Sequence, residues 1–196
     1  TVINNVETLI NVIPIVLEGG EAFATVGTAE STGTRLFCLS GDVGAPGTYE
    51  VEFGATLAEL LRQAGGVQGE LRAVMLGGAA GSFIGPDQLD LPLTFEAARA
   101  AGVSLGSGVI MAFNTTRAMK DIVRRVARFF RDESCGQCVP CRVGTVRVEE
   151  AVARANGIID VELIDELDRA MKDASICGLG HTAASVVRSA IGQGLI

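Results

Sequence analysis

Three of the five cysteines in this 196-residue chain recur at every third position, in the stretch Cys135-Gly136-Gln137-Cys138-Val139-Pro140-Cys141. A Cys-x-x-Cys-x-x-Cys loop can wrap one side of a cubane, so that each thiolate reaches a different iron. Gly136 and Pro140 favour the backbone curvature that such a loop needs. A remote fourth ligand completes the site, and Cys177 follows after 35 intervening residues. The sequence therefore predicts one [4Fe–4S] cluster held by Cys135, Cys138, Cys141 and Cys177.

The same cysteines allow two other interpretations. Structural zinc also binds four thiolates, although it usually takes them from two Cys-x-x-Cys pairs rather than from a triple and a single. Alternatively, the cysteines are structural or core residues without a metal. A two-cluster ferredoxin is excluded, because its run ends in a further Cys-Pro, whereas the third cysteine here is followed by Arg142-Val143-Gly144-Thr145.

Two further residues are predicted to stand apart from this site. Cys38 lies between Phe37 and Leu39 in a predicted strand, so we expect a buried apolar side chain. His181 is the only histidine, and we expect a surface residue at a helix start rather than a group that tunes the cluster. One histidine in this position allows no Ser/His/Asp or Cys/His arrangement, so no catalytic residue is predicted.

The composition excludes several classes of protein. Hydrophobic residues make up 48% of the chain, which argues against disorder, and no apolar run reaches the roughly 18 residues of a membrane helix. The net charge of −7 makes nucleic acid an unsuitable partner. Five cysteines without a secretion signal favour metal binding over disulfides. Because the chain opens on Thr1 rather than Met, we expect a processed chain or a piece of a longer one.

The pattern of apolar residues predicts two modules. A helix from about Asn5, started by Asn4 and Glu7 as a capping box, precedes a mixed unit over residues 33–116. That unit is expected to contain a hairpin, a helix capped by Thr56, and strands near residues 74–76, 89–93 and 109–113. After residue 116 we expect a bundle of four short helices. The second of these helices should end near Asn156-Gly157, and the first carries a basic face.

Two stretches around the cysteines resemble a known family, and they read Glu133-Ser134-Cys135-Gly136-Gln137-Cys138-Val139-Pro140-Cys141-Arg142-Val143-Gly144-Thr145 and Ser175-Ile176-Cys177-Gly178-Leu179-Gly180. They resemble the C-terminal part of the NADH-binding flavoprotein subunit (the F-type subunit) of complex I, NADH:quinone oxidoreductase. The sequence is also similar to the diaphorase subunits of NAD-linked hydrogenases and formate dehydrogenases, which the ending 178–183 resembles more. Residues 4–8 and 41–66 extend the likeness, because they resemble the family's Asn-Asn-Val-Glu-Thr stretch and its β-grasp module.

The resemblance implies an α+β fold. A small β-grasp domain of the soluble-ligand-binding type is followed by a four-helix bundle that carries the iron–sulfur cluster. Residues 1–32 would be the remnant of a flavin domain with a linker helix, residues 33–116 the β-grasp domain, and residues 117–196 the cluster-binding bundle.

The resemblance also implies cofactors and partners. FMN and NADH bind in the full-length subunit, in an N-terminal flavin domain that nothing in this chain supplies. Asn4, Asn5 and Thr8 are carried over as flavin-proximal residues, together with Leu179. Electrons would pass from FMN through the [4Fe–4S] cluster to other iron–sulfur subunits, and the fragment alone would be inactive with NADH.

The expected partners are thus the flavin domain of the same subunit and the other iron–sulfur subunits, with no nucleic acid and no direct insertion into a membrane. The expected location is the cytoplasm, with contact to the inner face of the membrane through partner subunits. The alternative function is a non-redox docking or ligand-binding module with a structural metal site.

Overall fold

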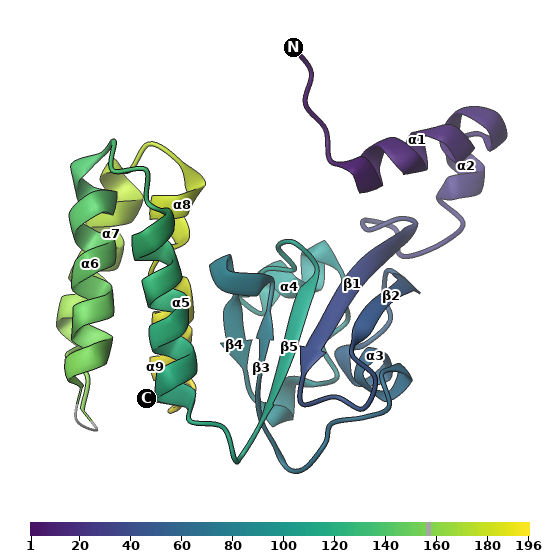
Figure 1. The fold of residues 1–196 in the computed structure, drawn as a ribbon. Coiled ribbons are helices and arrows are strands. Elements are labelled where there is room, and N and C mark those ends of the chain that lie inside the picture. The colour runs from purple at the N-terminus through teal and green to yellow at the C-terminus, as the bar shows by residue number, and fades with distance from the viewer. Residues whose placement is uncertain (156–157) are drawn as a thin grey trace.

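The computed structural model describes residues 1–155 and 158–196 of the chain (Figure 1). Its elements are, in order, α1 (Val6–Glu18), α2 (Gly20–Phe23), β1 (Thr34–Gly41), β2 (Gly47–Glu52), α3 (Leu57–Gln63), β3 (Leu71–Leu76), the 3-10 helix η1 (Gly78–Ala80), β4 (Ser82–Ile84), the 3-10 helix η2 (Pro86–Gln88), α4 (Phe95–Ala100), β5 (Val109–Asn114), α5 (Met119–Glu133), α6 (Val139–Arg154), α7 (Val161–Ala174), α8 (Gly178–Thr182) and α9 (Ser185–Gly192).

The five strands form one mixed sheet in the order β2-β1-β5-β3-β4. The predicted hairpin is confirmed, since β1 and β2 pair in antiparallel register. The central strand β5 runs parallel to β1 and antiparallel to β3. Two segments about 70 residues apart in the sequence therefore lie side by side at the middle of the sheet (Figure 1).

Both faces of the sheet are covered near β3. Val74 and Leu76 point into a core that they share with α3 and α4. Ala73 and Met75 point the other way, into a core that they share with α5, α6, α7 and α9. Burial on both faces explains why this strand is apolar at consecutive positions instead of alternating.

The start of α3 follows its prediction closely. The Thr56 hydroxyl accepts from the Glu59 backbone N–H, and the Glu59 carboxylate accepts from the Thr56 N–H. This reciprocal pair is a capping box, and it fixes where the helix begins.

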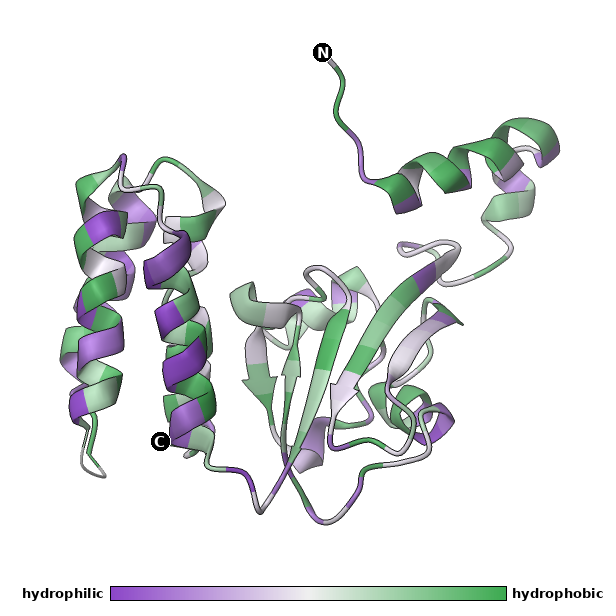
Figure 2. Cartoon of the chain, viewed as in Figure 1, coloured by the Kyte–Doolittle hydropathy of each residue, from purple (hydrophilic) through white to green (hydrophobic). Residues whose placement is uncertain are grey.

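The cap of the first helix lies one residue later than predicted. Asn5, not Asn4, caps α1, because the Asn5 side chain accepts from the Glu7 backbone N–H at 2.8 Å. Pro14 lies inside the helix, and no residue of α1 is buried. Figure 2 shows this apolar helix projecting from the rest of the chain.

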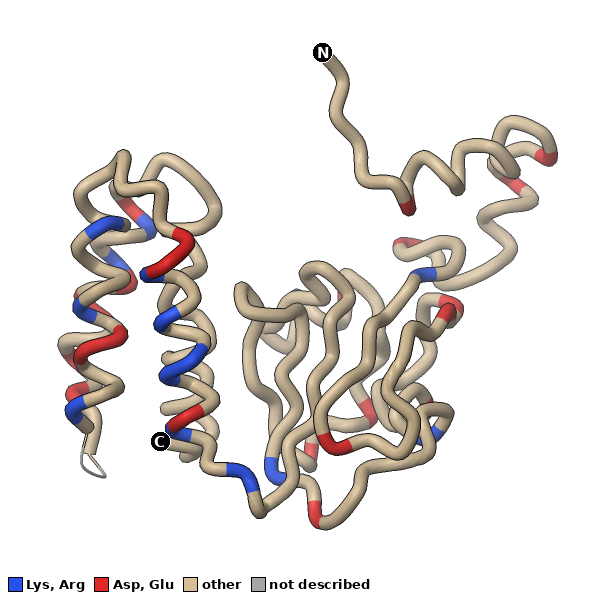
Figure 3. The backbone as a smooth tube through the Cα atoms, viewed as in Figure 1, with Lys and Arg blue, Asp and Glu red and all other residues tan. Residues whose placement is uncertain are grey.

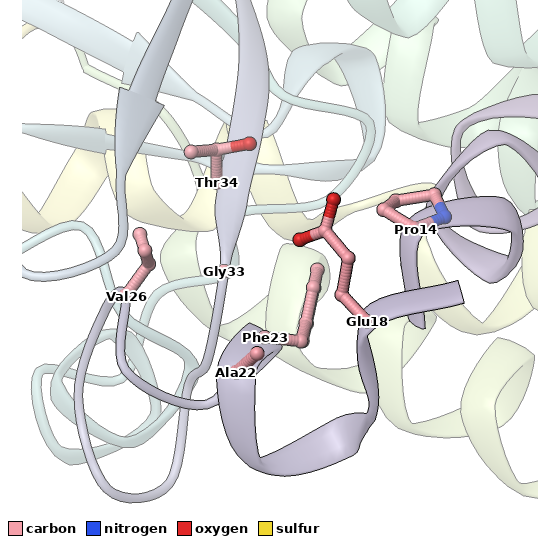
Figure 4. A pocket seen from close by; sticks show the side chains of 7 residues that line it. All are labelled: Pro14, Glu18, Ala22, Phe23, Val26, Gly33 and Thr34. Carbon is pink, nitrogen blue, oxygen red and sulfur yellow. The ribbon is translucent and has the colours of Figure 1, made fainter. Parts of the chain in front are cut away.

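A small contact fixes the segment that follows α1. The Phe23 ring lies against Gly33, as Figure 4 shows, and a Cβ atom at Gly33 would lie 2.3 Å from that ring. Gly33 also has a φ of +86°, so this position requires glycine for both reasons. The shallow pocket around Phe23 is lined by Pro14 and Glu18 among others, and none of the predicted ligand cysteines lies in its lining.

One strand prediction was wrong. Residues 89–93 do not form a strand of the sheet; their backbone instead bonds the start of α3, with the Leu57 N–H donating to the Leu91 carbonyl. The second edge strand is β4, which pairs with β3 through only three residue pairs. Pro92 cannot donate to a ladder, and this agrees with its place outside the sheet.

The C-terminal part of the chain is helical from α5 onward. The predicted fourth helix corresponds to α9, and the short α8 is an additional helix ahead of it, so the described residues from 119 on contain five helices rather than four. Gly144 lets α6 approach α7, because a Cβ atom there would lie 2.6 Å from the Met171 side chain. The predicted helix end near Asn156-Gly157 lies outside the described residues, and α6 is assigned up to Arg154.

Helix α9 joins the helical part to the sheet. It covers the free edge of β4, where the Phe83 N–H donates to the Ser189 hydroxyl at 2.9 Å. Arg72 on β3 adds a bond from its guanidinium to the Gly194 carbonyl at 3.0 Å. The helical part and the sheet are therefore held together directly, and Figure 1 shows them side by side.

A search of the described helices found none that is both long and apolar enough to span a bilayer.

Candidate metal centre

The four cysteines of interest lie in two loops at one end of the helical part. Cys135, Cys138 and Cys141 belong to the connection from α5 to α6 and to the first turn of α6. Cys177 is the residue that precedes α8, in the turn after α7. Figure 1 shows both connections at the end of the bundle that lies away from the link to β5. The fold thus brings together two segments that the sequence predicted to share one site.

Local chemistry explains the shape of the first loop. Gly136 has a φ of +75°, which a residue with a side chain rarely adopts. Pro140 lies in the first turn of α6, where its missing N–H has no cost. The Arg142 guanidinium reaches back and donates to the Gly136 carbonyl at 2.9 Å. The three cysteines are therefore presented by a loop that is closed by its own residues.

Backbone N–H groups favour the thiolate form at Cys138. Its pKa lies below the ordinary value of a thiol, chiefly because the Ile176 N–H points at the sulfur. The Cys141 N–H and the Ser175 hydroxyl act in the same direction. The turn that carries Cys177 thus already touches the loop that carries Cys138. Deprotonated sulfur is the form that binds metal.

Cys141 experiences the opposite effect. It is buried, with 4% of its surface exposed, and this burial raises the pKa of its thiol. The neighbouring sulfurs of Cys138 and Cys177 raise it further, since negative charges at close range oppose one another. Three sulfurs from two loops are therefore close enough to interact, and a positively charged iron centre would relieve this repulsion.

The donor set fits an iron–sulfur cluster better than a zinc ion. Four tetrahedral thiolates around zinc, with Zn–S near 2.3 Å, would lie about 3.8 Å from one another. In a cubane each thiolate binds a different iron, so a run of three cysteines and one remote cysteine suits it, whereas structural zinc usually takes two pairs. Within residues 1–155 and 158–196, no group of three or more His, Cys, Asp or Glu side chains is placed to hold a metal ion.

Gly180 makes room for this arrangement. A Cβ atom there would lie 2.2 Å from the Ser175 hydroxyl oxygen and 3.2 Å from the Cys141 Cβ. In the sequence, Gly180, Ser134 and Ser175 stood out only as members of the two stretches that resemble the family, and no role was predicted for them. The two serines share a position, since each lies one or two residues before a predicted ligand.

The two residues predicted to stand apart gave mixed results. Cys38 is exposed on β1, with its sulfur 3.6 Å from the Thr48 hydroxyl, so the prediction of a buried side chain was wrong. His181 is half-buried in α8 rather than a free surface residue. One of its ring nitrogens lies 2.9 Å from the Ser175 carbonyl oxygen, so it helps to fix the turn before Cys177.

The predicted flavin-proximal residues occupy two separate places. Asn4 is exposed ahead of α1, while Asn5 and Thr8 line an open cavity of about 510 Å³ between α1 and the sheet. Arg35 and Phe95 form part of its opposite wall. Leu179 lies on α8 and packs against the helical core. The structure groups Asn5 with Thr8 and places Leu179 beside the cysteine loops instead.

Two family models match this chain on either side of the junction between sheet and helices. Residues 35–123 match the SLBB domain, and residues 121–193 match the NADH-ubiquinone oxidoreductase-F iron-sulfur binding region. The second match contains all four clustered cysteines. The chain is therefore similar to F-type subunits in both its sheet and its helical part.

Individual relatives show the same similarity. The F subunit of NADH-quinone oxidoreductase from Mycobacterium bovis is 39% identical over 197 residues, which covers 97% of this chain and 44% of the relative. NADP-reducing hydrogenase subunit HndC of Solidesulfovibrio fructosivorans is 33% identical, over 96% of this chain and 40% of the relative. The chain described here therefore spans less than half the length of these curated relatives.

A solved structure shows the same fold. A chain in the crystal structure of an NAD⁺-reducing [NiFe]-hydrogenase in the air-oxidized state superposes with a TM-score of 0.85. It is 39% identical, and the match covers 98% of this chain and 34% of that chain. The sheet and the helical part of this chain are thus similar to a region of one chain of that hydrogenase structure.

Proposed function

We propose that this chain is the electron-relay part of an NADH dehydrogenase flavoprotein subunit. The observation that carries the proposal is the meeting of the Cys138 and Cys141 loop with the Cys177 turn at one end of the helices. A bound [4Fe–4S] cluster would supply one-electron transfer between reduced FMN and partner iron–sulfur subunits.

The residues of the chain would divide the work of holding the cluster. Cys135, Cys138, Cys141 and Cys177 are the proposed ligands. The N–H groups of Ile176 and Cys141 stabilise negative charge on the Cys138 sulfur. Arg142 keeps the loop closed and places a positive charge beside it. These groups are fixed in the fold, so little reorganisation would accompany a change in charge at the sulfurs.

The proposed domain division follows the same junction. Residues 1–32 would be a linker helix with the remnant of a flavin domain, residues 33–116 a β-grasp domain, and residues 117–196 a helical bundle that carries the cluster. The two family matches, which meet at residues 121–123, support a boundary near residue 117. The strand order with two parallel central strands supports the β-grasp assignment.

The activity of the whole subunit is part of the proposal. FMN and NADH would bind in the flavin domain of the full-length protein, with Asn4, Asn5, Thr8 and Leu179 near the flavin. The position of Asn5 and Thr8 on an open cavity supports a contact of this kind. The partners would be that flavin domain and other iron–sulfur subunits, in a complex on the cytoplasmic side that touches the membrane only through those subunits.

The test is anaerobic reconstitution of the chain, with iron and sulfide analysis and electron paramagnetic resonance of the reduced protein. We expect about four irons per chain and reversible reduction. Cys177→Ala should lose the cluster. The matched control Cys38→Ala should keep it, because Cys38 lies on β1 in the sheet. Loss of iron in Cys38→Ala would overturn the ligand assignment. A metal centre that cannot be reduced would favour the alternative, a docking or ligand-binding module with a structural metal.

A further inference from the structure

Each of the two cysteine loops carries a serine whose hydroxyl lies beside a ligand cysteine. Ser134 comes from the loop between α5 and α6, and Ser175 comes from the turn between α7 and α8. The two hydroxyls approach Cys141 and Cys138 from different loops.

The Ser134 hydroxyl is oriented toward the sulfur of Cys141. Its oxygen lies 3.3 Å from that sulfur, and it accepts from the Gly136 backbone N–H at 3.4 Å. A thiolate bound to iron has no proton to donate, so the hydroxyl must be the donor in this pair. The Gly136 contact occupies one lone pair of the oxygen and leaves its hydrogen free for the sulfur.

The Ser175 hydroxyl is enclosed and lacks an ordinary acceptor. Its oxygen has no access to solvent and no hydrogen-bond partner within normal distance among the described residues. It lies against Gly180, and Gly180 in turn lies beside the Cys141 Cβ. His181 contacts the same residue through the Ser175 carbonyl. A buried hydroxyl without a partner requires an acceptor, and sulfurs bound at the adjoining cysteine loop would supply one.

We propose that Ser134 and Ser175 are positioning residues that donate hydrogen bonds to the Cys141 and Cys138 thiolates and so raise the reduction potential of the cluster. The inference rests on the proposed function, since it needs those cysteines to be ligands. Reduction adds one electron, and part of the added charge falls on the sulfurs. Hydrogen bonds to anionic sulfur are stronger than those to less charged sulfur, so the two donors stabilise the reduced state more.

The experiment is a potentiometric titration of the reconstituted chain, followed by electron paramagnetic resonance. Ser134→Ala and Ser175→Ala should each lower the reduced-to-oxidised ratio at a fixed potential by about threefold to tenfold, where tenfold corresponds to 59 mV for one electron. Ser134→Thr keeps the hydroxyl and should stay near the parent value. Ser104→Ala is the matched control, because Ser104 is exposed in a loop of the sheet domain.

The possible results separate the two proposals. Unchanged potentials in both alanine variants, with full iron content, would overturn the serine proposal and leave the relay function intact. Absence of a reducible cluster in the unaltered chain would instead overturn the proposed function. If Ser175→Ala fails to load iron, the comparison of Ser134→Ala with Ser134→Thr still tests the proposal. Ser134 is half-exposed, so its substitution should not prevent cluster assembly. Equal potentials in those two variants would then contradict the proposal.

Discussion

Asp42 connects the sheet to the start of the helical part through a single side chain. It follows β1 and is buried, with 8% of its surface exposed. Its carboxylate accepts from the Asn114 N–H at 2.9 Å, at the end of β5, and from the Arg117 guanidinium at 3.0 Å. The Arg117 bond, with help from the Asn114 N–H, holds the pKa of Asp42 below its ordinary value. One carboxylate therefore fixes the path of the chain between its two parts.

We expect Asp42→Asn to lower the free energy of unfolding by about 1–2 kcal/mol at pH 7. The expected loss is small because the Arg117 side chain is half-exposed, and solvent screens its attraction to Asp42. Since the folded pKa lies below the unfolded value of about 3.9, the stabilisation is present above that value and is lost as the pH falls through the folded pKa. Urea unfolding at pH 7 and near pH 3 would measure both limits, with the exposed Asp90→Asn as control. An equal difference at both pH values would contradict this account.

Residue types in the sequence predicted the cysteine site but not every side-chain direction. The cluster needs thiolates at a fixed spacing, so the pattern alone was informative. Cys38 was placed in the core because its neighbours Phe37 and Leu39 are apolar. In the structure those neighbours are buried and Cys38 alternates to the exposed face. Strand alternation was the stronger rule here, and it outweighs the apolar character of a single residue.

At the scale of elements, α5 and α6 are joined by a buried acid between two bases. Glu149 on α6 is 7% exposed, and it pairs with Arg124 at 3.0 Å and Arg131 at 3.2 Å, both on α5. Figure 3 shows the line of basic residues on α5. Part of the basic face predicted from the sequence therefore serves contact between helices.

Glu149→Gln should lower the free energy of unfolding by about 1–3 kcal/mol, since it removes a charge that two arginines surround. Glu150→Gln is the matched control on the same helix. Its carboxylate is more exposed and pairs with Arg147 and Arg154 of α6 itself, so we expect a change within about 0.5 kcal/mol. Thermal and denaturant unfolding would compare the two variants. Equal losses of unfolding free energy in Glu149→Gln and Glu150→Gln would show that the ion pairs between α5 and α6 stabilise the protein no more than those within α6.

The long elements followed from sequence patterns, whereas the short ones depended on tertiary contacts. Thr56 caps α3 as predicted, and Asp160 caps α7 in the same way, because each cap is a contact within four residues. Strand β4 has only three residues and is defined by its partners β3 and α9. Similarly, only α9 corresponds to the predicted fourth helix, whereas the short α8 was not predicted. The chain turns between the two at Ala183 and Ala184, both of which are buried.

At the scale of the whole molecule, the described residues contain the cysteine site of the proposed relay but no site of the kind that binds a hydride acceptor. NADH gives up a hydride, which carries two electrons, whereas an iron–sulfur cluster accepts one electron at a time. Within the described residues, no strand leads through a loop of several glycines into an α-helix of the kind that holds a cofactor phosphate. Gly77-Gly78 after β3 lead instead into the short 3-10 helix η1.

We therefore expect the reconstituted chain alone not to oxidise NADH, even with FMN added. A diaphorase assay with NADH, FMN and an artificial one-electron acceptor is the measurement. The control is free FMN at the same concentration. Turnover above that control would show that the flavin site is complete in this chain, and the relay proposal would then be wrong.

The site as a whole was only partly predictable for a geometric reason. The four ligands could be selected because cysteine is rare and its spacing is restrictive. The contacts of Ser134, Ser175 and Gly180 arise only when two loops about 40 residues apart meet. No local pattern in the sequence encodes such a meeting.

The cover that α9 provides for β4 has a consequence for synthesis of the protein. Strand β4 ends at Ile84 and α9 begins at Ser185, so the ribosome makes the cover about a hundred residues after the edge that it protects. At about 5–20 residues per second this interval lasts roughly 5–20 s. During that time the outer N–H and C=O groups of β4 are open to pairing with a neighbouring nascent chain, which is a common route to aggregation. Yield of soluble protein should therefore depend on chaperone supply and slow growth as well as on iron.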